Sequence, residues 1–425
     1  MSDAQVTSRR WAVSTVVVAV VVLLVALATR AGAQPPPGSA NCPLFPADDV
    51  WHADVSGLPV HGRSNAWLAA MGGPDRRLHP DFGPSGEAMP YGIPYTVVDG
   101  RHQRVQVSFE YDDESDPGPY PFGPDTPIES GSDRHALMLD AESCTLYELY
   151  AAQYAPGGST AGSGAVWNLR SNALRPAGWT SADAAGLPIL PGLLRKDEVA
   201  AGVVDHAIRI TAQRTDRSYV WPARHQAGAT NDANLPPMGA RFRLKAGYDI
   251  GRFRPDTQVV LRAMQRHGVI LADNGSNWYF TGTAENGWDT RMLDELKTVP
   301  AGAFEAVDAS SLMVDPNSGL VRGGQAPVGT ATTVRPRPRP AAPVAAPAAT
   351  TTPPPPSTTT TSSTTSTTET TLDGETAAPD RAAVQDGSAD DHKTGSGPRT
   401  LGLAAWLAAA ATTAWRMRRG FGSAP

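Results

Sequence analysis

The stretch Asp-Arg-His-Ala-Leu-Met-Leu-Asp (133–140) and the stretch Cys-Thr-Leu-Tyr-Glu-Leu-Tyr (144–150) decide how this chain folds. Three residues, Ala-Glu-Ser (141–143), separate the two runs, which predicts a β-hairpin. The run Arg104–Tyr111 alternates Val, Val, Phe and Tyr with polar residues, the period-two pattern of a strand with one buried face. Further strands are predicted at Val203–Thr211, Tyr219–Trp221, Ala240–Tyr248 and Val269–Leu271, and Asp273–Ser276 before Trp278–Phe280 predicts another hairpin turn.

The predicted helices are few and short. They are expected over Ser64–Met71, from Asp256 to Gly268, and from Asp289 to a break before Pro300. Long loops rich in proline and glycine separate the strands. The sequence therefore predicts an α+β, β-rich fold with a sandwich or jelly-roll-like core. One globular domain over 41–315 is long enough to bury a sizeable core.

Only two cysteines occur in the chain, Cys42 and Cys144. Both lie in the part that the sequence assigns to an oxidising compartment, where pairing is favoured. We therefore expect a Cys42–Cys144 disulfide, with two buried thiols as the alternative. No cysteine and histidine spacing indicates zinc, and no metal or cofactor is expected.

The first 33 residues have the organisation of a secretory signal peptide. Two arginines precede the apolar run Trp11–Thr29, and Ala-Gly-Ala (31–33) has the small-residue pattern of a signal-peptide cleavage site, with cleavage expected before Gln34. The apolar run is also long enough to span a bilayer, so a retained N-terminal anchor is the alternative.

The last hundred residues change character abruptly. Residues 323–399 are rich in Pro, Thr and Ser and lack aromatic residues, which predicts a disordered stalk. An apolar segment at 400–416 is followed by a short basic tail at 417–425, which predicts a transmembrane segment with a cytoplasmic end. A surface amphipathic helix is the alternative. Together the termini predict an extracytoplasmic protein anchored to the cell membrane or wall, with membrane contact through its terminal apolar segments.

Several stretches of the folded part resemble a group of secreted bacterial proteins of actinobacterial type. The resemblance implies export and a single module, and it implies no activity and no catalytic residues. The stretches that carry it are Ser-Asp-Arg-His-Ala-Leu (132–137), Cys-Thr-Leu-Tyr-Glu-Leu-Tyr (144–150), Ser-Asn-Ala-Leu-Arg-Pro (171–176), Gly-Trp-Thr-Ser-Ala-Asp-Ala-Ala-Gly-Leu-Pro (178–188), Pro-Pro-Met-Gly (236–239) and Ala-Asp-Asn-Gly-Ser (272–276).

Two predicted strands each carry a histidine on the apolar side, His135 and His206. If the two met in a cleft, with His225 from a loop as a third, they could run general acid–base chemistry, since imidazole titrates near neutral pH, or they could hold a metal. Asp133 lies two residues before His135 and could orient its ring. The alternative is that each histidine is a core residue bonded to a backbone carbonyl. No Gly-x-Ser-x-Gly motif supplies a serine nucleophile.

Carboxylates also cluster along the chain. The acidic loop around Asp112–Asp116, with Asp125 and Glu129, could supply a glycosidase pair or a calcium site, or simply be a solvated loop. Asp81, in His-Pro-Asp-Phe-Gly (79–83), could be positioned by a turn.

Candidate substrate-binding residues are cationic or aromatic. Arg241, Arg243 and Lys245 share one face of a predicted strand and could bind uronate or phosphate groups, or form an ordinary wet face. Trp179 and Trp221 could stack on sugar rings. The formal net charge of −6 gives no indication of nucleic acid binding.

Two functions remain open from the sequence. One is a surface enzyme, a hydrolase or lyase, acting on cell-wall or extracellular polysaccharide. The other is a non-catalytic carbohydrate-binding, adhesion or structural envelope protein.

Overall fold

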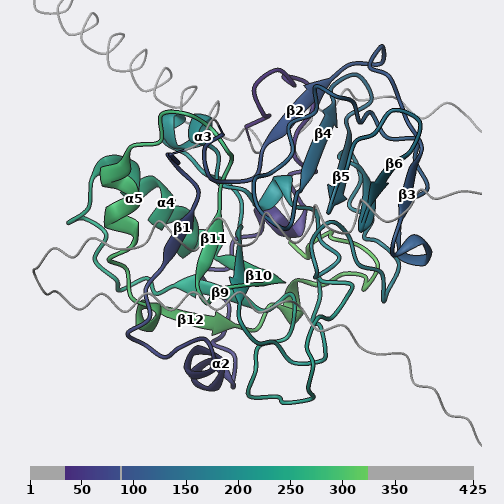
Figure 1. Cartoon of the computed structure of the whole chain (residues 1–425). Helices are drawn as coiled ribbons and strands as arrows, with labels where there is room; N and C mark the ends of the chain where they lie inside the picture. Colours follow the sequence, from purple (N-terminus) through teal and green to yellow (C-terminus); the bar gives the residue numbers. More distant parts are fainter. Residues whose placement is uncertain (1–33, 87–88, 324–425) are drawn as a thin grey trace, which may run out of the picture. The chain divides into compact units, whose positions relative to one another are not determined.

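The computed structural model describes residues 34–86 and 89–323, which all lie within one compact unit of the chain (Figure 1). The predicted signal peptide, almost all of the stalk, the C-terminal apolar segment and the basic tail lie outside the described residues. The described part is rich in strands and has a few short helices, so the predicted α+β, β-rich fold is confirmed. None of its helices has the length and apolar content that crossing a bilayer requires.

The larger sheet has six strands in the order β1-β11-β8-β10-β9-β12. Its pairing is mixed, because β1 runs parallel to β11 and β8 runs parallel to β10, whereas the other pairs are antiparallel. The strands are β1 (His79–Asp81), β8 (Ile208–Ala212), β9 (Arg241–Leu244), β10 (Val269–Asn274), β11 (Tyr279–Thr281) and β12 (Phe304–Val307).

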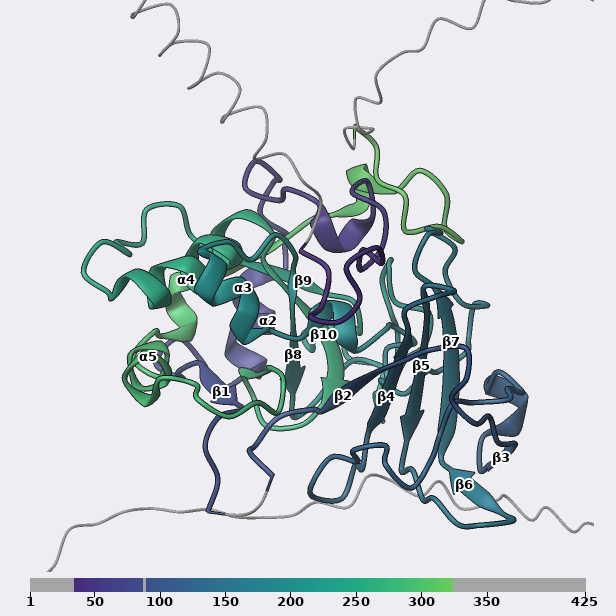
Figure 2. The same ribbon diagram turned by 90° about the horizontal axis from the view of Figure 1, so that it is seen from above.

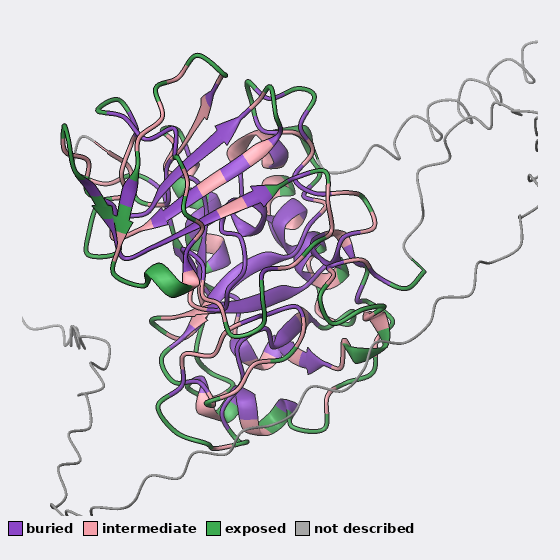
Figure 3. Ribbon diagram, turned by 90° about the vertical axis from the view of Figure 1, so that its right-hand side faces the viewer, coloured by how far each residue is buried: buried purple, intermediate pink, exposed green. Residues whose placement is uncertain are grey.

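The smaller sheet has the order β2-β4-β5-β7, and two further strands pair parallel to each other as β3 and β6. Strand alternation in β4 divides two cores: Leu137 and Leu139 join the main core, while Ala136 and Met138 join a second core under β3 and β6. Most of the strands are buried in Figure 3. The bounds are β2 (Tyr95–Val98), β3 (Val107–Phe109), β4 (Ala136–Asp140), β5 (Thr145–Tyr150), β6 (Ser159–Ala161) and β7 (Ser163–Asn168).

The helices α3, α4 and α5 lie on one side of the six-stranded sheet, and the four-stranded sheet lies on the other (Figure 2). Asp289 caps α5, as its sequence predicts, by accepting a hydrogen bond from the backbone of Arg291. The helices are α2 (Ser64–Ala70), α3 (Lys196–Ala201), α4 (Pro255–Arg266) and α5 (Thr290–Leu296), with short 3₁₀ turns η1 (Val50–His52), η2 (Asp112–Glu114), η3 (Leu190–Gly192), η4 (Ala301–Ala303) and η5 (Ser310–Leu312).

Two strand predictions are wrong. The turn at Asp273–Ser276 does not join a hairpin, because β8 lies between β10 and β11 in the sheet. The predicted strand Tyr219–Trp221 is reduced to one isolated bridge, at Tyr219, and Pro222 follows it. Proline cannot donate to a sheet ladder, which explains the early end.

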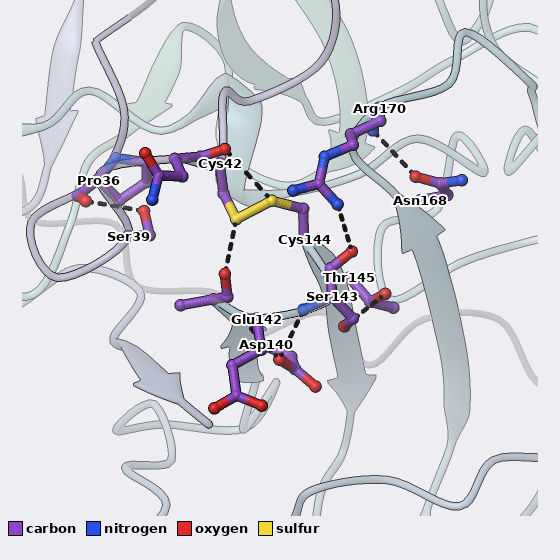
Figure 4. Close-up of a disulfide and its surroundings, with 12 residues drawn as sticks. Pro36, Ser39, Cys42, Asp140, Glu142, Ser143, Cys144, Thr145, Asn168 and Arg170 are labelled. Atoms are coloured by element: carbon purple, nitrogen blue, oxygen red, sulfur yellow. Dashed lines mark hydrogen bonds between the residues drawn. A yellow bond between two sulfur atoms is a disulfide. The ribbon is translucent and has the colours of Figure 1, made fainter. Parts of the chain in front are cut away.

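The predicted disulfide is present. Cys42 and Cys144 are bonded to each other, both side chains are fully buried, and Cys144 lies in the turn between β4 and β5 (Figure 4). Asp140 orders this turn by accepting hydrogen bonds from the backbone of Glu142 and Ser143. The bond therefore joins the start of the described chain to the hairpin that the sequence singled out.

Candidate functional site

The candidate site is built on one face of the six-stranded sheet. Paired residues of neighbouring strands share a face, and the register places Asp81, Thr281 and Arg209 in one row across β1, β11 and β8. The same face carries Asp273 only because of an irregularity in β10. The register shifts between Leu271 and Asp273, so that Asp273 pairs with Thr211 and joins the face of Arg209.

Arg209 is the centre of this arrangement. Its side chain is 4 % exposed and donates two hydrogen bonds to the carboxylate of Asp183, at 2.9 and 2.7 Å. A third nitrogen donates to the hydroxyl of Thr281 at 2.6 Å, and Asp273 lies 3.5 Å from Nη2. Burial lowers the pKa of Arg209, but the charges of Asp183 and Asp273 raise it above its usual value, so the guanidinium stays charged.

The four-stranded sheet contributes His135, which directly precedes β4. Its Nδ1 lies 2.5 Å from Oε2 of Glu129, and its Nε2 lies 3.1 Å from the carbonyl oxygen of Ala182. Burial lowers the pKa of this imidazole, yet the charge of Glu129 and the hydrogen bond to it raise the pKa to about 9. His135 is therefore a cation at neutral pH, and its ring is held from both nitrogens.

Two carboxyl groups of the site have raised pKa values. Burial and the charge of Asp183 raise the pKa of Asp273 to about 8, against the opposing effect of Arg209. Partial desolvation and the charges of Glu129 and Asp133 raise the pKa of Asp81. A carboxyl group with a pKa near 8 is largely protonated at neutral pH and can act as a general acid.

The site is open to solvent on one side. The side chain of Asp273 is 22 % exposed and that of Glu129 is 19 % exposed, whereas Asp183 is fully buried. Asp81 and Asp133 are exposed. Arg209 and Asp183 are thus buried, whereas the carboxyl groups around them are partly or largely exposed to solvent. Among residues 34–86 and 89–323, no group of three or more histidine, cysteine or acidic side chains could hold a metal ion.

The sequence paired His135 with the wrong carboxylate. Arg134 has a φ of +48°, so the chain enters β4 only at Ala136 and strand alternation does not extend back to Asp133. The hydroxyl of Ser132 bonds the Asp133 carboxylate, while Glu129 holds the His135 ring. Asp133 still contributes its charge to the site, because it acts on the pKa of Asp81 and of Asp273.

The other two predicted histidines have different partners, and within the described residues no hydrogen bond or ion pair connects them with His135. His206 is buried and bonds the carbonyl of Ala207 and the carboxylate of Glu198 on α3. His225 bonds the carbonyl of Ala184, and its Nε2 lies 3.9 Å from Glu114. His206, which precedes β8, thus faces helix α3, and each of the three histidines is bonded to a backbone carbonyl, the alternative that the sequence left open.

The three cations of the predicted charge clamp all bond other parts of the protein, and of the three only Lys245 is exposed. Arg241 is 2 % exposed and donates to the carbonyl oxygens of His267 and Val50, and burial lowers its pKa to about 9. Arg243 bonds three backbone carbonyls and pairs with Glu305. The ammonium group of Lys245 donates to the carbonyl of Gly302. These cations hold loops against β9, a role that the sequence pattern does not reveal.

The two predicted stacking tryptophans are half-buried. The guanidinium of Arg175 lies 5.4 Å from the ring centroid of Trp179. The indole nitrogen of Trp221 donates to the carbonyl of Ser318. Both rings therefore already contact other parts of the protein, and neither is among the residues placed around Arg209.

Sequence reasoning missed Arg209, Asp183 and Asp273. One signal was present: Arg209 interrupts the apolar strand Ile208–Ile210 with a charge, and a buried charge requires a partner. Asp273 was interpreted as a turn residue because Asn-Gly-Ser follows it. Only the β10 irregularity shows that its side chain belongs to the site.

Replacing Glu129 by Gln is expected to remove the cause of the raised His135 pKa. The folded-state pKa of about 9 exceeds the unfolded value of about 6.5, so this interaction stabilises the fold fully below pH 6.5 and is lost as the pH rises through 9. Glu129→Gln should therefore lower the melting temperature more at pH 6 than at pH 9.5, and the His135 ring should titrate below its usual pKa in an NMR titration.

The matched control is Asp125→Asn, a carboxylate in the same loop that lies 3.8 Å from His102. It should leave the His135 titration where it is. An unchanged His135 pKa in Glu129→Gln would show that this carboxylate does not hold the imidazolium.

Comparison of the chain with protein families, curated proteins and solved structures finds no match. The resemblance to secreted bacterial proteins stays a prediction from the sequence.

Proposed function

We propose that this chain is an extracytoplasmic enzyme that cleaves cell-wall or extracellular polysaccharide by general acid–base catalysis. The observation that carries the proposal is the position of Asp273 beside Arg209 on one sheet face, with the exposed carboxylate of Asp133 acting on its pKa, which is raised to about 8. Glycosidic bond cleavage needs this pairing of functions, an acid for the leaving oxygen and a second carboxyl group for the other reactant.

Each residue of the site has a role in this proposal. Asp273 donates a proton to the glycosidic oxygen, and Asp133, an exposed carboxylate whose charge acts on the pKa of Asp273, accepts a proton or stabilises the positive charge that develops on the sugar. Arg209 fixes Asp273 and stays charged throughout. His135 and Glu129 are positioning residues, because their contacts are with each other and with the backbone.

The proposed location rests on two supports. The sequence predicts export and anchoring at both termini, and the Cys42–Cys144 bond is of the kind that persists in oxidising compartments. The partners expected are polysaccharide and, through the terminal segments, a membrane.

Incubating the purified full-length chain with a polysaccharide panel tests the proposal. The panel contains glucan, xylan, mannan, arabinogalactan, polygalacturonate and hyaluronan, and the readouts are new reducing ends and unsaturated products. Release of either from at least one polysaccharide is expected. Binding without release, shown by affinity electrophoresis on the same panel, would instead favour the non-catalytic carbohydrate-binding function.

A further inference from the structure

A cavity of about 440 Å³ lies beside the candidate site, between β1 and α5. This volume falls in the range of roughly 300–1,000 Å³ that small-molecule sites occupy. Helix α5 and the residue after it contribute Thr290, Leu293, Asp294 and Lys297, whose spacing of three, four and seven residues places them on one helix face. The opposite wall includes β1, which is one of the two edge strands of its sheet.

An exposed aromatic ring lines this cavity. Tyr91 is 61 % exposed, among the most exposed large hydrophobic side chains of the described part. Its backbone is held by two hydrogen bonds with Gly83, at 3.1 and 2.9 Å. Gly83 has a φ of +130°, and a Cβ there would lie 2.6 Å from Cδ1 of Leu293, so only glycine allows this approach to α5. The ring is thus carried on backbone that pairs with Gly83.

The polar groups of the cavity are varied. The His79 ring stacks on Tyr279 with 3.9 Å between centroids. Burial and the charges of Lys297 and Arg76 lower the pKa of His79, so it is neutral at pH 7 and offers one donor and one acceptor. Lys297 and Asp294 lie 3.2 Å apart. The cavity therefore combines an aromatic face with several hydrogen-bonding groups and little net charge.

Asp81 connects the cavity with the candidate site. It lines the cavity, and it stands in the same sheet row as Thr281 and Arg209. Asp81 is therefore shared by the cavity and the site. Besides Asp273, which is largely protonated at neutral pH, the carboxyl groups of the site are four, Asp81, Glu129, Asp133 and Asp183, against the two cations Arg209 and His135.

We propose that this cavity is a subsite for neutral pyranose residues, stacked on Tyr91, of the polysaccharide that the protein cleaves. The inference rests on the proposed function and deepens it by naming the substrate class. A pyranose ring has an apolar face of C–H groups and an edge of hydroxyls, which match Tyr91 and the polar groups of the opposite wall. A uronate residue would bring its carboxylate toward a site in which carboxyl groups outnumber cations, which is unfavourable.

A neutral substrate also decides between the two cleavage reactions. Elimination removes the C5 proton of a sugar whose neighbouring carboxylate makes that proton acidic, and a neutral pyranose has no such group. Hydrolysis breaks the C1–O bond: water adds its oxygen to C1 and gives one proton to the base, while Asp273 gives a proton to the departing oxygen. We therefore infer hydrolysis of a neutral glycan.

The test compares wild type, Tyr91→Ala and Tyr91→Phe in the full-length protein. Substrates are neutral glucan, xylan, mannan and arabinogalactan, with polygalacturonate and hyaluronan as acidic counterparts, and the readout is kcat and KM from reducing ends. Neutral polymers should be cleaved and acidic ones should not. Tyr91→Ala should raise KM about tenfold, the scale of losing an aromatic anchor, with an unchanged pH profile. Tyr91→Phe keeps the ring and should stay within about twofold.

The outcomes separate the two proposals. Cleavage of a neutral glycan with an unchanged KM in Tyr91→Ala would overturn the subsite and leave the enzyme standing. Cleavage of acidic polymers only, with unsaturated products, would overturn the neutral substrate class and leave an enzyme of the other type. Absence of cleavage on every polymer would overturn both.

Discussion

Replacing Asp273 by Asn is expected to lower kcat for polysaccharide cleavage by about two to four orders of magnitude, the usual contribution of a general acid. The amide has nearly the same shape as the carboxyl group but has no transferable acidic proton. The ion pair of Arg209 with Asp183 stays in place, so the fold should be retained. The measurements are kcat from reducing-end release and the melting temperature.

The pH dependence gives a second readout for the same residue. Asp273 must be protonated to act, and burial and the charge of Asp183 raise its pKa to about 8. Wild-type kcat should therefore fall as the pH rises through about 8. In Asp273→Asn the residual kcat should not fall as the pH rises through about 8.

Asp113→Asn is the matched control, because Asp113 is an exposed carboxylate in η2, outside the site. It should have wild-type kcat and the wild-type pH profile. If Asp273→Asn kept more than a tenth of the wild-type kcat, and this kcat still fell as the pH rose through about 8, another group would be the acid.

Removing the disulfide is expected to cost about 4 to 5 kcal/mol of the free energy of unfolding. The bond closes a loop with a sequence separation of 102 residues, and the chain-entropy model gives about that value for such a loop. The double variant Cys42→Ala with Cys144→Ala suits this test because both side chains are fully buried, and alanine adds no polar group there. Small domains have only about 5 to 15 kcal/mol in total, so the loss is large.

Urea denaturation monitored by tryptophan fluorescence measures this effect. The midpoint should fall strongly in the double variant, and the wild type under reducing conditions should approach it. Both comparisons matter, because the variant also loses the packing of two sulfur atoms. The free energy of unfolding could differ from that of the oxidised wild type by less than about 1 kcal/mol in both the double variant and the reduced wild type. That result would mean that the unfolded chain gains little freedom when the bond is absent.

The sequence predicted the parts of the fold that depend on neighbouring residues. The runs 136–140 and 145–150 form paired strands, Asp289 caps a helix, and the two cysteines are joined. Alternation also placed Leu137 and Leu139 together on the side of β4 that faces the main core. These results follow from side-chain periodicity and local hydrogen bonding, which depend on residues that are only a few positions apart in the sequence.

The tertiary structure alone decided which strands became neighbours. A turn signal at Asp273–Ser276 indicates where the chain reverses, but it does not show that β8 enters between the two strands that flank it. Pairing partners are set by long-range burial, which a local pattern does not record. The shift in register at Ala272 has the same origin and is what brings Asp273 to Arg209.

The amino-acid sequence by itself thus determined the β-rich class, the disulfide and the export prediction. Only the folded chain decided that Arg209, Asp183 and Asp273 form one site with His135 and Glu129, while Arg241 and His206 serve the framework. The physical reason is that a buried charge needs partners in space. Those partners come from strands and loops far apart along the chain.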